Sequence, residues 1–500
     1  MKTTLLFLSL AIAAASIQAQ TDSTHVGRLL EHQSETATVV SLAFGNPAVN
    51  QLRHATSLSR IEGAFTLRKD NEAVDIQLGH QDNTIAFDAD TYIKHRTSTI
   101  WGHATYQNGR QHGIRWNETS DPERVAPYLL ADSVATSRMK LERYGFGGGY
   151  ANRNGRWLWG VEGGYDAGLY YRSSDPRPRN VTSQLRVSLG GGLNVTPRYI
   201  AAIALGYQKY KQTNNVAFFS ELGQERLFHL TGLGNDYGRF AGTGYDTYYK
   251  GNQFLASATF HPIQNGLSAT IQAERFSFDN VLTSLNKLPL AHVSHNSVHA
   301  ELAWIERVWR VAAHINASRR VGTENIFGDA ASQVYPKIGA IDMFHQNRFD
   351  AAINGVWRLT GRRFTLEIHP RVRYDHQNAI YPDPACRQLI NNFHYGMRIR
   401  AARRFHTVSL AATIGADFCH NLKQELTLTN TKTELLGLRQ AIERTHTLLS
   451  HNRSALEARL AAAIPLSNRF ALQIALRYQH SRYTLNTHTN HFKSSICLIF

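Results

Sequence analysis

The chain of 500 residues contains only three cysteines, Cys386, Cys419 and Cys497. This number is too small for a disulfide framework. Cys386 falls in an expected connecting loop, and Cys419 falls at the end of a strand that could lie nearby. A single bridge between these two cysteines and isolated thiols are therefore both open interpretations.

The chain also lacks long hydrophobic runs. After the N-terminus it has no run of about eighteen apolar residues, so a helical membrane span is excluded. Lys2 precedes an apolar run from Leu5 to Ala15, and small and polar residues lead to Ala19. This pattern predicts a secretory signal over residues 1–19, cleaved after Ala19. A β-barrel reconciles export with a mean hydropathy of −0.34, because its lipid face needs only alternate residues to be apolar.

Catalytic and metal-binding signatures are missing as well. Asp, Glu, Ser and His residues are scattered without a nucleophile elbow or a zinc pattern. His292, His295 and His299 span an expected loop and strand start, and no Cys or carboxylate pattern completes a site with them. The sequence therefore predicts no enzyme, no metal and no cofactor.

The last nine residues are the most informative part of the chain. Phe492, Ser494, Ile496, Leu498 and Phe500 share one face of a strand, and the chain ends on the aromatic ring. Such a strand is typical of outer-membrane β-barrels, which present it to the insertion machinery before it closes the sheet in lipid. We therefore expect the outer membrane of a Gram-negative bacterium, with the lipid bilayer and lipopolysaccharide as surroundings.

Period-two alternation recurs from about Leu58 to the C-terminus, in segments long enough to cross a bilayer at a tilt. Every second connection is short, and the others are long. This asymmetry predicts an all-β, antiparallel transmembrane barrel over residues 57–500, with periplasmic turns and long extracellular loops. Strand parity gives about 18 strands, within a range of 14 to 20, provided that Ala73 to His95 forms one long, bulged strand.

The formal net charge is +16, and 24 histidines are present. A lumen or surface that meets lipopolysaccharide and anionic solutes explains this charge better than nucleic acid does. Charged residues recur at positions expected to face the lumen, on strands that are neighbours in the chain: Arg371, Arg373, Arg398, Arg400, Arg459, Arg477, Glu367 and Glu457. They predict either a salt-bridged lumen that stiffens the barrel or a path that attracts anions.

The longest expected loop, Gln212 to Asn252, is rich in aromatic residues. A solvated loop would normally avoid so much apolar area, so we expect this loop to fold into or over the barrel mouth. Its candidate ligand-binding residues are Phe218, Phe219, Phe228, Tyr237, Phe240, Tyr245 and Tyr249. These residues predict either contact with a ligand or structural closure of the mouth.

A helix is expected within another long loop, which runs from His420 to His451. Leu435, Leu438 and Ile442 share one helical face after Thr433, a plausible N-cap. The pattern predicts a short packing helix over residues 434–445.

Residues 20–56 precede the barrel and form either a plug or a periplasmic tail. They contain Asn46, Pro47 and Ala48, followed by Leu52. An Asn-Pro-Ala element just before the first strand resembles the N-terminal hatch of the fatty-acid transporter superfamily of outer-membrane barrels. The resemblance implies that Asn46 and Pro47 belong to a plug.

Three separated segments resemble signatures of an uncharacterised family of Bacteroidota outer-membrane β-barrels: residues 102–109, 175–180 and 232–240. The resemblance runs from about Asn46 to Phe500. It implies the barrel and the phylum, and it supplies neither an activity nor functional residues.

These observations predict a barrel that binds or passes a small-molecule nutrient, as a passive, porin-like uptake channel. The alternative is a barrel without a conducting pore, which binds at the surface or serves a neighbouring uptake protein. Active transport is disfavoured, because the chain has no room for a large plug and a 22-stranded barrel.

Overall fold

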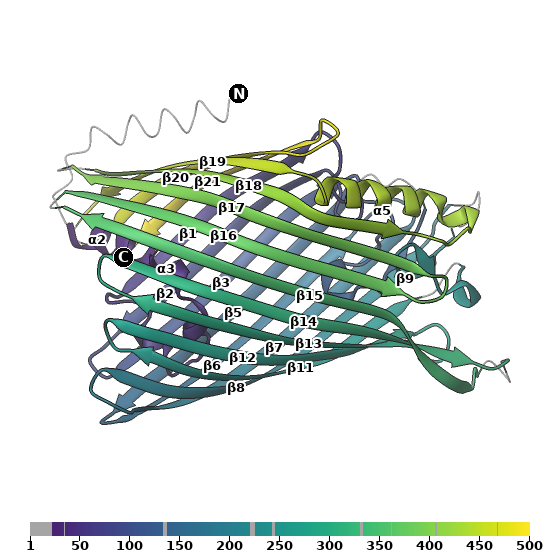
Figure 1. The fold of residues 1–500 in the computed structure, drawn as a ribbon, viewed down its shortest axis with the longest axis horizontal. Coiled ribbons are helices and arrows are strands. Elements are labelled where there is room, and N and C mark those ends of the chain that lie inside the picture. The colour runs from purple at the N-terminus through teal and green to yellow at the C-terminus, as the bar shows by residue number, and fades with distance from the viewer. Residues whose placement is uncertain are drawn as a thin grey trace.

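The computed structural model describes residues 23–34, 36–133, 138–220, 226–242, 246–330, 334–361, 363–405, 408–467 and 469–500. The expected signal, residues 1–19, lies outside this part of the chain. Eighteen strands form one closed antiparallel sheet, as predicted (Figure 1). Each strand pairs with the next one in the chain, and the last strand pairs with the first, so the sheet closes into a barrel. 

The barrel strands have these bounds: β1 Leu58–Asp70, β2 Gln81–Lys94, β3 Ser98–His112, β5 Arg138–Asn154, β6 Trp157–Tyr171, β7 Arg177–Asn194, β8 Tyr199–Ala217, β11 Thr247–Pro262, β12 Gly266–Leu282, β13 Leu288–Ile305, β14 Trp309–Phe327, β15 Lys337–Thr360, β16 Phe364–Tyr381, β17 Cys386–Arg404, β18 Ser409–Thr427, β19 Arg453–Pro465, β20 Ala471–Arg482 and β21 His488–Ile499. Many of these strands extend further toward the long loops than the apolar alternation in the sequence predicts. Above the membrane both faces of a strand meet water, so the apolar alternation disappears while the pairing continues.

The expectation of one strand from Ala73 to His95 was wrong. Residues 71–80 form a loop between β1 and β2. The carboxylate of Asp75 accepts a hydrogen bond from the backbone N–H of Gln77 at 2.8 Å, and Gly79 has a φ of +73°. This local turn explains the change of apolar parity near Asp82. The strand count is unaffected, because the loop joins the same two strands.

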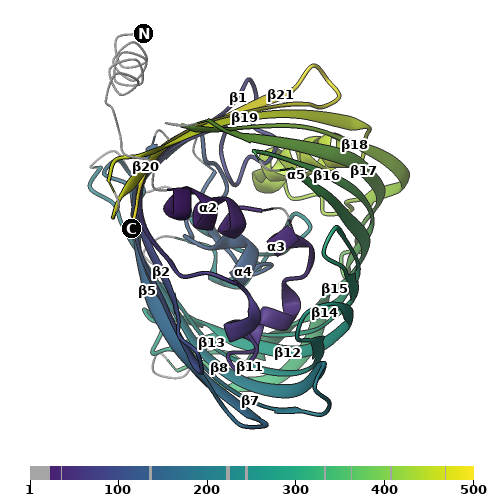
Figure 2. The same cartoon turned by 90° about the vertical axis from the view of Figure 1, so that its left-hand side faces the viewer.

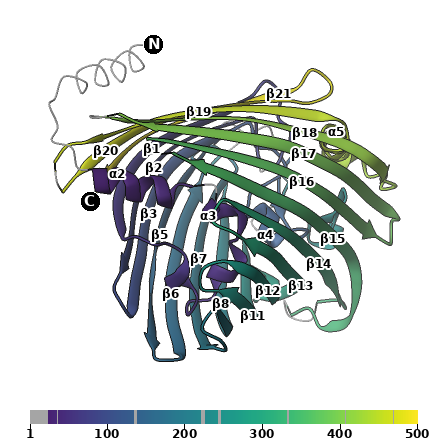
Figure 3. The same cartoon turned by 60° about the vertical axis from the view of Figure 1, so that its left-hand side comes forward.

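The two ends of the barrel differ. Short turns, N-terminal helix α2 (Ser23–His32) and the C-terminus lie at one end, and helix α5 (Leu436–Leu449) lies at the other (Figures 1 and 3). Short turns are periplasmic in such barrels, so α2 marks the periplasmic end and α5 the extracellular end. No helix in the described part of the chain is long and apolar enough to cross a membrane.

An apolar band covers the outer wall. Exposed aromatic side chains gather near the short turns, as expected for the girdle at a membrane interface. They are Trp157, Trp159, Trp304, Trp309, Trp357, Phe364, Phe470 and Phe500.

The closing strand pairs with β1 through its whole length. Phe500 exchanges backbone hydrogen bonds with Ser59 at 3.0 and 3.1 Å, and its ring packs edge-on against Phe470 with ring centroids 6.4 Å apart. We expect deletion of Phe500 to reduce outer-membrane assembly, because both the last backbone pair and the ring are lost. Immunodetection in outer-membrane fractions measures this effect, and a Phe500→Tyr variant is the control. Equal amounts of the truncated protein would contradict the prediction.

An N-terminal segment, residues 23–57, lies inside the barrel at the periplasmic end (Figure 2). It contains α2, α3 (Thr36–Val39) and two 3₁₀ turns, η1 (Leu42–Gly45) and η2 (Asn50–Leu52). Buried Val26 and Leu29 of α2 pack against β19–β21 and β1, while buried Val39 and Val40 pack against β13–β15. The segment thus contacts opposite sides of the wall.

The extracellular end is filled by a second structure, here called the cap. It comprises α4 (Pro122–Val125), β4 (Leu130–Ala131), β9 (Phe228–Gly232), β10 (Asn235–Asp236), η3 (Gly238–Phe240), η4 (Thr433–Leu435) and α5. β4, β9 and β10 form a small sheet. The cap shares one hydrophobic cluster with the inner wall of β8 and β11–β14, so it is held by apolar packing.

Candidate functional site

The aromatic loop places most of its described candidate residues in the hydrophobic cluster of the cap. Phe228 and Phe240 are 2 % exposed, and Tyr249, which lies on β11, is fully buried in the same cluster. The Tyr237 ring stacks on Phe240 with centroids 5.3 Å apart. These four side chains belong to the hydrophobic cluster of the cap or pack against it.

The other three candidates are separated from that cluster. Phe218 packs against a small cluster around Leu227, and Tyr245 lies outside the described residues. Phe219 is 66 % exposed, and its ring lies 4.1 Å from the guanidinium of Arg177. The six described candidates therefore do not form one cluster.

A cavity of about 460 Å³ lies beneath the cap. Its roof is apolar and includes Leu230 and Leu438, while Gln346, Arg348 and Gln377 of the barrel wall give it a polar side. This volume is within the usual range for a small-molecule site. A hollow of about 1150 Å³ also lies on the outer wall, but outward-facing residues such as Trp157 and Ile203 line it, so it faces lipid.

The predicted lumen charges do face inward, and some form matched pairs. Arg371 binds Asp417 through two guanidinium nitrogens, and Arg373 binds Asp350. On the far wall, Arg60 lies directly opposite Asp90, and their side chains are 2.9 Å apart. In these pairs each arginine has a carboxylate of its own.

Arg400, Arg459 and Arg477 belong to a different arrangement, here called the basic belt, and Arg398 lies one level away from it. The belt is a single row of inward-facing residues that lie opposite one another on seven adjacent strands, β15 to β21. Its members, in order, are Arg358, Glu367, Arg400, Thr413, Arg459, Arg477 and Lys493. Neighbouring strands are about 4.8 Å apart, so the row extends about 29 Å around the wall.

Cations outnumber carboxylates in the belt. Glu367 is 1 % exposed and is shared by Arg400, at 3.2 Å, and Arg358, at 3.6 Å. Glu457, one level away, lies 3.0 Å from Arg477 and 3.5 Å from Arg398. The belt is therefore positively charged overall.

Sequence reasoning missed Arg358 and Lys493. Both alternate in phase with residues that were predicted to face the lumen, but Arg358 lies close to a turn and Lys493 lies in the closing strand, where the apolar lipid face gives the stronger pattern. Lys493 reaches Glu62 of β1 at 3.1 Å. Inward parity applied to every strand would have found both.

The N-terminal segment lies next to the belt. The Ser34 hydroxyl donates a hydrogen bond to Glu367 at 2.5 Å, and the Gln33 amide donates one to Gln473 of β20 at 2.8 Å. On another side of the wall, the buried carboxylate of Glu301 accepts hydrogen bonds from the backbone N–H groups of Ser41 and Leu42, at 3.0 and 3.1 Å. The segment is thus joined to the wall at the level where the belt begins.

Two glycines make room for the Asn46-Pro47-Ala48 turn. A Cβ atom on Gly160 would lie 2.5 Å from the carbonyl carbon of Pro47, and one on Gly190 would lie 2.2 Å from Oδ1 of Asn46. The same Asn46 oxygen accepts the backbone N–H of Ala48 at 3.0 Å. The turn that the sequence singled out therefore sits directly on the backbone of β6 and β7.

The three histidines His292, His295 and His299 do not lie on the same face of their strand. His292 is near Asp279, at 2.8 Å, whereas His295 and His299 lie on the opposite face of β13, as their odd spacing from His292 requires. Among the described residues, Glu31, His32 and His54 do gather within 4.8 Å. The two imidazole rings are stacked with centroids 3.8 Å apart, so their lone pairs lie in parallel planes and do not converge on one ion.

That group instead holds the N-terminal segment together. Glu31 accepts hydrogen bonds from Thr56 at 2.6 Å and from the backbone N–H of Ala55 at 3.1 Å. Burial alone would raise the pKa of Glu31, but hydrogen bonds from His54, Thr56 and Ala55 outweigh it and lower the pKa to about 2. Burial and the neighbouring His54 lower the pKa of His32. At neutral pH the group therefore contains a carboxylate that ties α2 to the chain before β1.

The cysteines stay apart in the structure. Cys386, Cys419 and Cys497 are all buried, free thiols. Cys386 lies near the amide of Asn235, at 3.6 Å, and Cys419 lies 3.9 Å from His394.

A closed antiparallel barrel of 18 strands, with an apolar outer band and a charged lumen, defines an outer-membrane β-barrel of a Gram-negative bacterium. Residues 47–500 match the model of a family of unknown function, DUF6850, and the chain belongs to this family. The family match assigns no activity. No curated protein matches the sequence.

Several solved structures share the barrel. The ferric preacinetobactin receptor BauA from Acinetobacter baumannii and the ferric yersiniabactin uptake receptor FyuA from Yersinia pestis are each 8 % identical to this chain, cover 89 % of it over 80 % of their own length, and have a TM-score of 0.42. The copper transporter OprC is also 8 % identical, covers 89 % of this chain over 81 % of its own length, and has a TM-score of 0.42. This level of similarity concerns the fold alone.

Proposed function

We propose that this barrel takes up a small anionic nutrient, with the N-terminal segment as a plug that moves aside. The observation that carries the proposal is the basic belt, because a row of cationic side chains on a lumen wall attracts anions and tunes selectivity. Matched pairs such as Arg371 with Asp417 stiffen the wall without this effect. The belt spans seven strands and begins at the level of the plug, where Glu367 accepts a hydrogen bond from Ser34.

The contacts of the plug suit a part that can be displaced. Its links to the wall are separate polar contacts, such as Ser34 with Glu367 and Ser41 and Leu42 with Glu301, together with small apolar clusters. The barrel, by contrast, is closed by continuous strand pairing. A solute that reaches the belt would meet α2 next, because the wall residues Ala463 and Ala471 that pack on α2 lie on the belt strands β19 and β20. The likeness of the Asn46-Pro47-Ala48 turn to a fatty-acid transporter hatch stays a prediction.

The alternative is a non-conducting barrel that binds at the surface or assists a neighbouring uptake protein. One observation favours it: folded elements fill both ends, and the cap is built on a large hydrophobic cluster. In that case the belt would be a stiffening element, and no solute would cross.

Flux of small solutes through proteoliposomes separates these functions. We expect the intact protein to pass succinate faster than glycerol, because the belt concentrates anions. Arg459→Gln combined with Arg477→Gln should reduce succinate flux to the glycerol level. The matched control is Arg371→Gln combined with Asp417→Asn, which removes a neutral pair and should leave the preference intact.

Liposomes without protein give the baseline for this measurement. Flux of both solutes at that baseline would reject uptake by the protein alone and favour the accessory barrel. Equal flux of succinate and glycerol above the baseline would reject the role of the belt.

A further inference from the structure

The cavity beneath the cap has a polar wall that comes from two adjacent strands. Arg348 of β15 lies directly opposite Gln377 of β16. Gln346, two residues away on β15, lies opposite the small residue Ala379 of β16. All four residues line the cavity of about 460 Å³. Because neighbouring strands are about 4.8 Å apart, the guanidinium and the two carboxamides can engage one small molecule together.

These three polar side chains are available to a ligand. Gln346, Arg348 and Gln377 make no side-chain hydrogen bond or ion pair with the part of the chain that the structure describes. Gln346 is only 8 % exposed, and buried polar groups in proteins are nearly always hydrogen-bonded. Arg348 is exposed on the inner face of the barrel, so a molecule in the cavity can reach its guanidinium.

The same cavity is also lined by two carboxylates, Asp75 of the loop before β2 and Glu123 of α4. The carboxylate of Asp75 already accepts the backbone N–H of Gln77. The carboxylate of Glu123 acts electrostatically on Arg348, but it forms no ion pair or hydrogen bond with any described residue. The cavity therefore offers a cationic group and an anionic group that are not in direct contact with each other.

The roof of the cavity is suited to apolar groups. Leu230 of β9 and Leu438 and Ile442 of α5 contribute to it. Apolar groups of a ligand beneath this roof would be removed from water, which favours binding in proportion to the area buried. A ligand that matches the whole lining therefore combines both charges, a hydrogen-bonding middle and apolar groups.

From this lining we propose that the cavity binds a short peptide with free termini and apolar side chains. Arg348 pairs with the terminal carboxylate, for which its planar guanidinium is suited, and Glu123 pairs with the terminal ammonium. The carboxamides of Gln346 and Gln377 bind the peptide group between them. A simple anion would be repelled by Glu123, and a simple cation would be repelled by Arg348. This site is separate from the basic belt and does not rest on the proposed uptake of anions.

Calorimetric titration of the intact, purified protein in a non-ionic detergent tests the proposal. The probes are dileucine, N-acetyl-dileucine, dileucine amide and diserine. We expect dileucine to bind most tightly. Blocking either terminus should weaken binding about 10- to 100-fold, the effect of one hydrogen-bonded charge. Diserine should also bind more weakly, because it has no apolar side chains to place beneath the roof.

Two substitutions assign the termini to their partners. Arg348→Gln should abolish the preference for dileucine over dileucine amide, and Glu123→Gln should abolish the preference for dileucine over N-acetyl-dileucine. The matched control is Arg319→Gln, which removes an arginine from the neighbouring strand β14. Arg319 precedes the inward-facing Arg320, lies on the outer face and does not line the cavity, so both preferences should persist.

Three results would overturn the proposal. The first is that dileucine does not bind, or that all four probes bind equally. The second is that N-acetyl-dileucine binds as tightly as dileucine, which would indicate a site for simple organic acids. The third is that both preferences persist in Arg348→Gln and Glu123→Gln, which would place the peptide elsewhere. The titration needs no flux, so a failure of the proposed uptake would leave this site standing.

Discussion

Deletion of residues 23–56 should raise the flux of small solutes through the reconstituted barrel about 10- to 1,000-fold. A minor conformational state is typically populated at 0.1–10 %, so removing the element that must move makes the open form the only form. The deleted part includes the contacts of Ser34 with Glu367 and of Ser41 and Leu42 with Glu301, and it leaves the strand pairing of the barrel intact. Efflux of glycerol and succinate from proteoliposomes measures the change.

A point substitution tests the same idea in the full chain. Gly190→Val would place a side chain where Oδ1 of Asn46 lies 2.2 Å from the new Cβ atom and the backbone nitrogen of Ala48 lies 2.8 Å from it. The Asn46-Pro47-Ala48 turn must then move away from β7. The flux of small solutes should rise to a level between those of the intact protein and the deletion variant. Gly191→Val is the matched control, because nothing lies within 4 Å of its Cβ position.

Unchanged flux in both the deletion and Gly190→Val would show that the N-terminal segment is not what restricts passage. The cap would then be the barrier. In that outcome, deletion of the loop from Phe218 to Tyr249 should increase flux, because Phe228 and Phe240 belong to the hydrophobic cluster of the cap.

The barrel was predictable because its signal is periodic and repeated. Alternation and the contrast between short and long connections predict 18 strands and the orientation. One strand was predicted to begin too early: residues 73–80 lie in the loop before β2. The error arose because the loop between β1 and β2, with its local turn at Asp75 and Gly79, contains no proline and no run of glycines that would indicate a loop in the sequence.

The helix in the loop that follows β18 was also predictable, since Leu435, Leu438 and Ile442 share a face in the sequence. In the structure Leu435 and Leu438 are buried in the hydrophobic cluster of the cap, and Ile442 packs against it. The observed helix, α5, starts two residues later than expected and extends to Leu449. Thr433 is not the N-cap of this helix: it begins the 3₁₀ turn η4, and Leu435 is the N-cap of α5.

The belt could be predicted only in part. The alternation of residues along a strand shows which arginines face the lumen. The pairing register between strands decides which arginines lie opposite one another, and this register depends on the exact length and type of each turn. The direct opposition of Arg459 and Arg477 follows from the hairpin between β19 and β20. Arg371 looked equivalent to these two in the sequence, and only the structure shows that Asp417 neutralises it.

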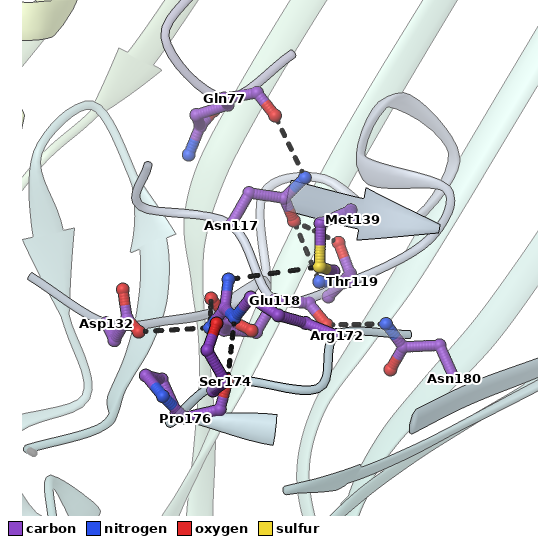
Figure 4. A network of polar contacts seen from close by, with 10 residues as sticks. All are labelled: Gln77, Asn117, Glu118, Thr119, Asp132, Met139, Arg172, Ser174, Pro176 and Asn180. Atoms are coloured by element: carbon purple, nitrogen blue, oxygen red, sulfur yellow. Dashed lines mark hydrogen bonds and ion pairs between the residues drawn. The ribbon is translucent and has the colours of Figure 1, made fainter. Parts of the chain in front are cut away.

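The second large effect is expected at a buried ion network in the cap (Figure 4). The Arg172 guanidinium donates a hydrogen bond to Glu118 at 2.9 Å and lies 3.5 Å from Asp132, and all three side chains are at most 1 % exposed. Arg172 also donates to the carbonyl oxygens of Ser174 and Pro176, at 3.2 and 2.8 Å. One cation thus links the loop after β3, strand β4 and the turn before β7.

Arg172→Met should destabilise the cap by about 3–5 kcal/mol, because it removes the cation that compensates the buried side chains of Glu118 and Asp132. Hydrogen exchange of the backbone amides in residues 113–132 measures the loss, and the barrel strands serve as an internal reference. The matched control adds Glu118→Gln and Asp132→Asn to Arg172→Met, which removes the unpaired charges and should restore part of the protection. Unchanged exchange in the single variant would show that the network does not hold the cap.

The same network predicts how the cap responds to pH. Burial raises the pKa of Glu118 well above its usual value of 4.5, although Arg172 opposes the shift. The folded cap therefore keeps a proton on Glu118 at pH values where the unfolded segment has lost it. Its stability falls as the pH rises above 4.5, until the folded carboxyl also ionises. Glu118→Gln should remove this decline in hydrogen-exchange protection of residues 113–132, and a decline of the same size in that variant would assign it to another group.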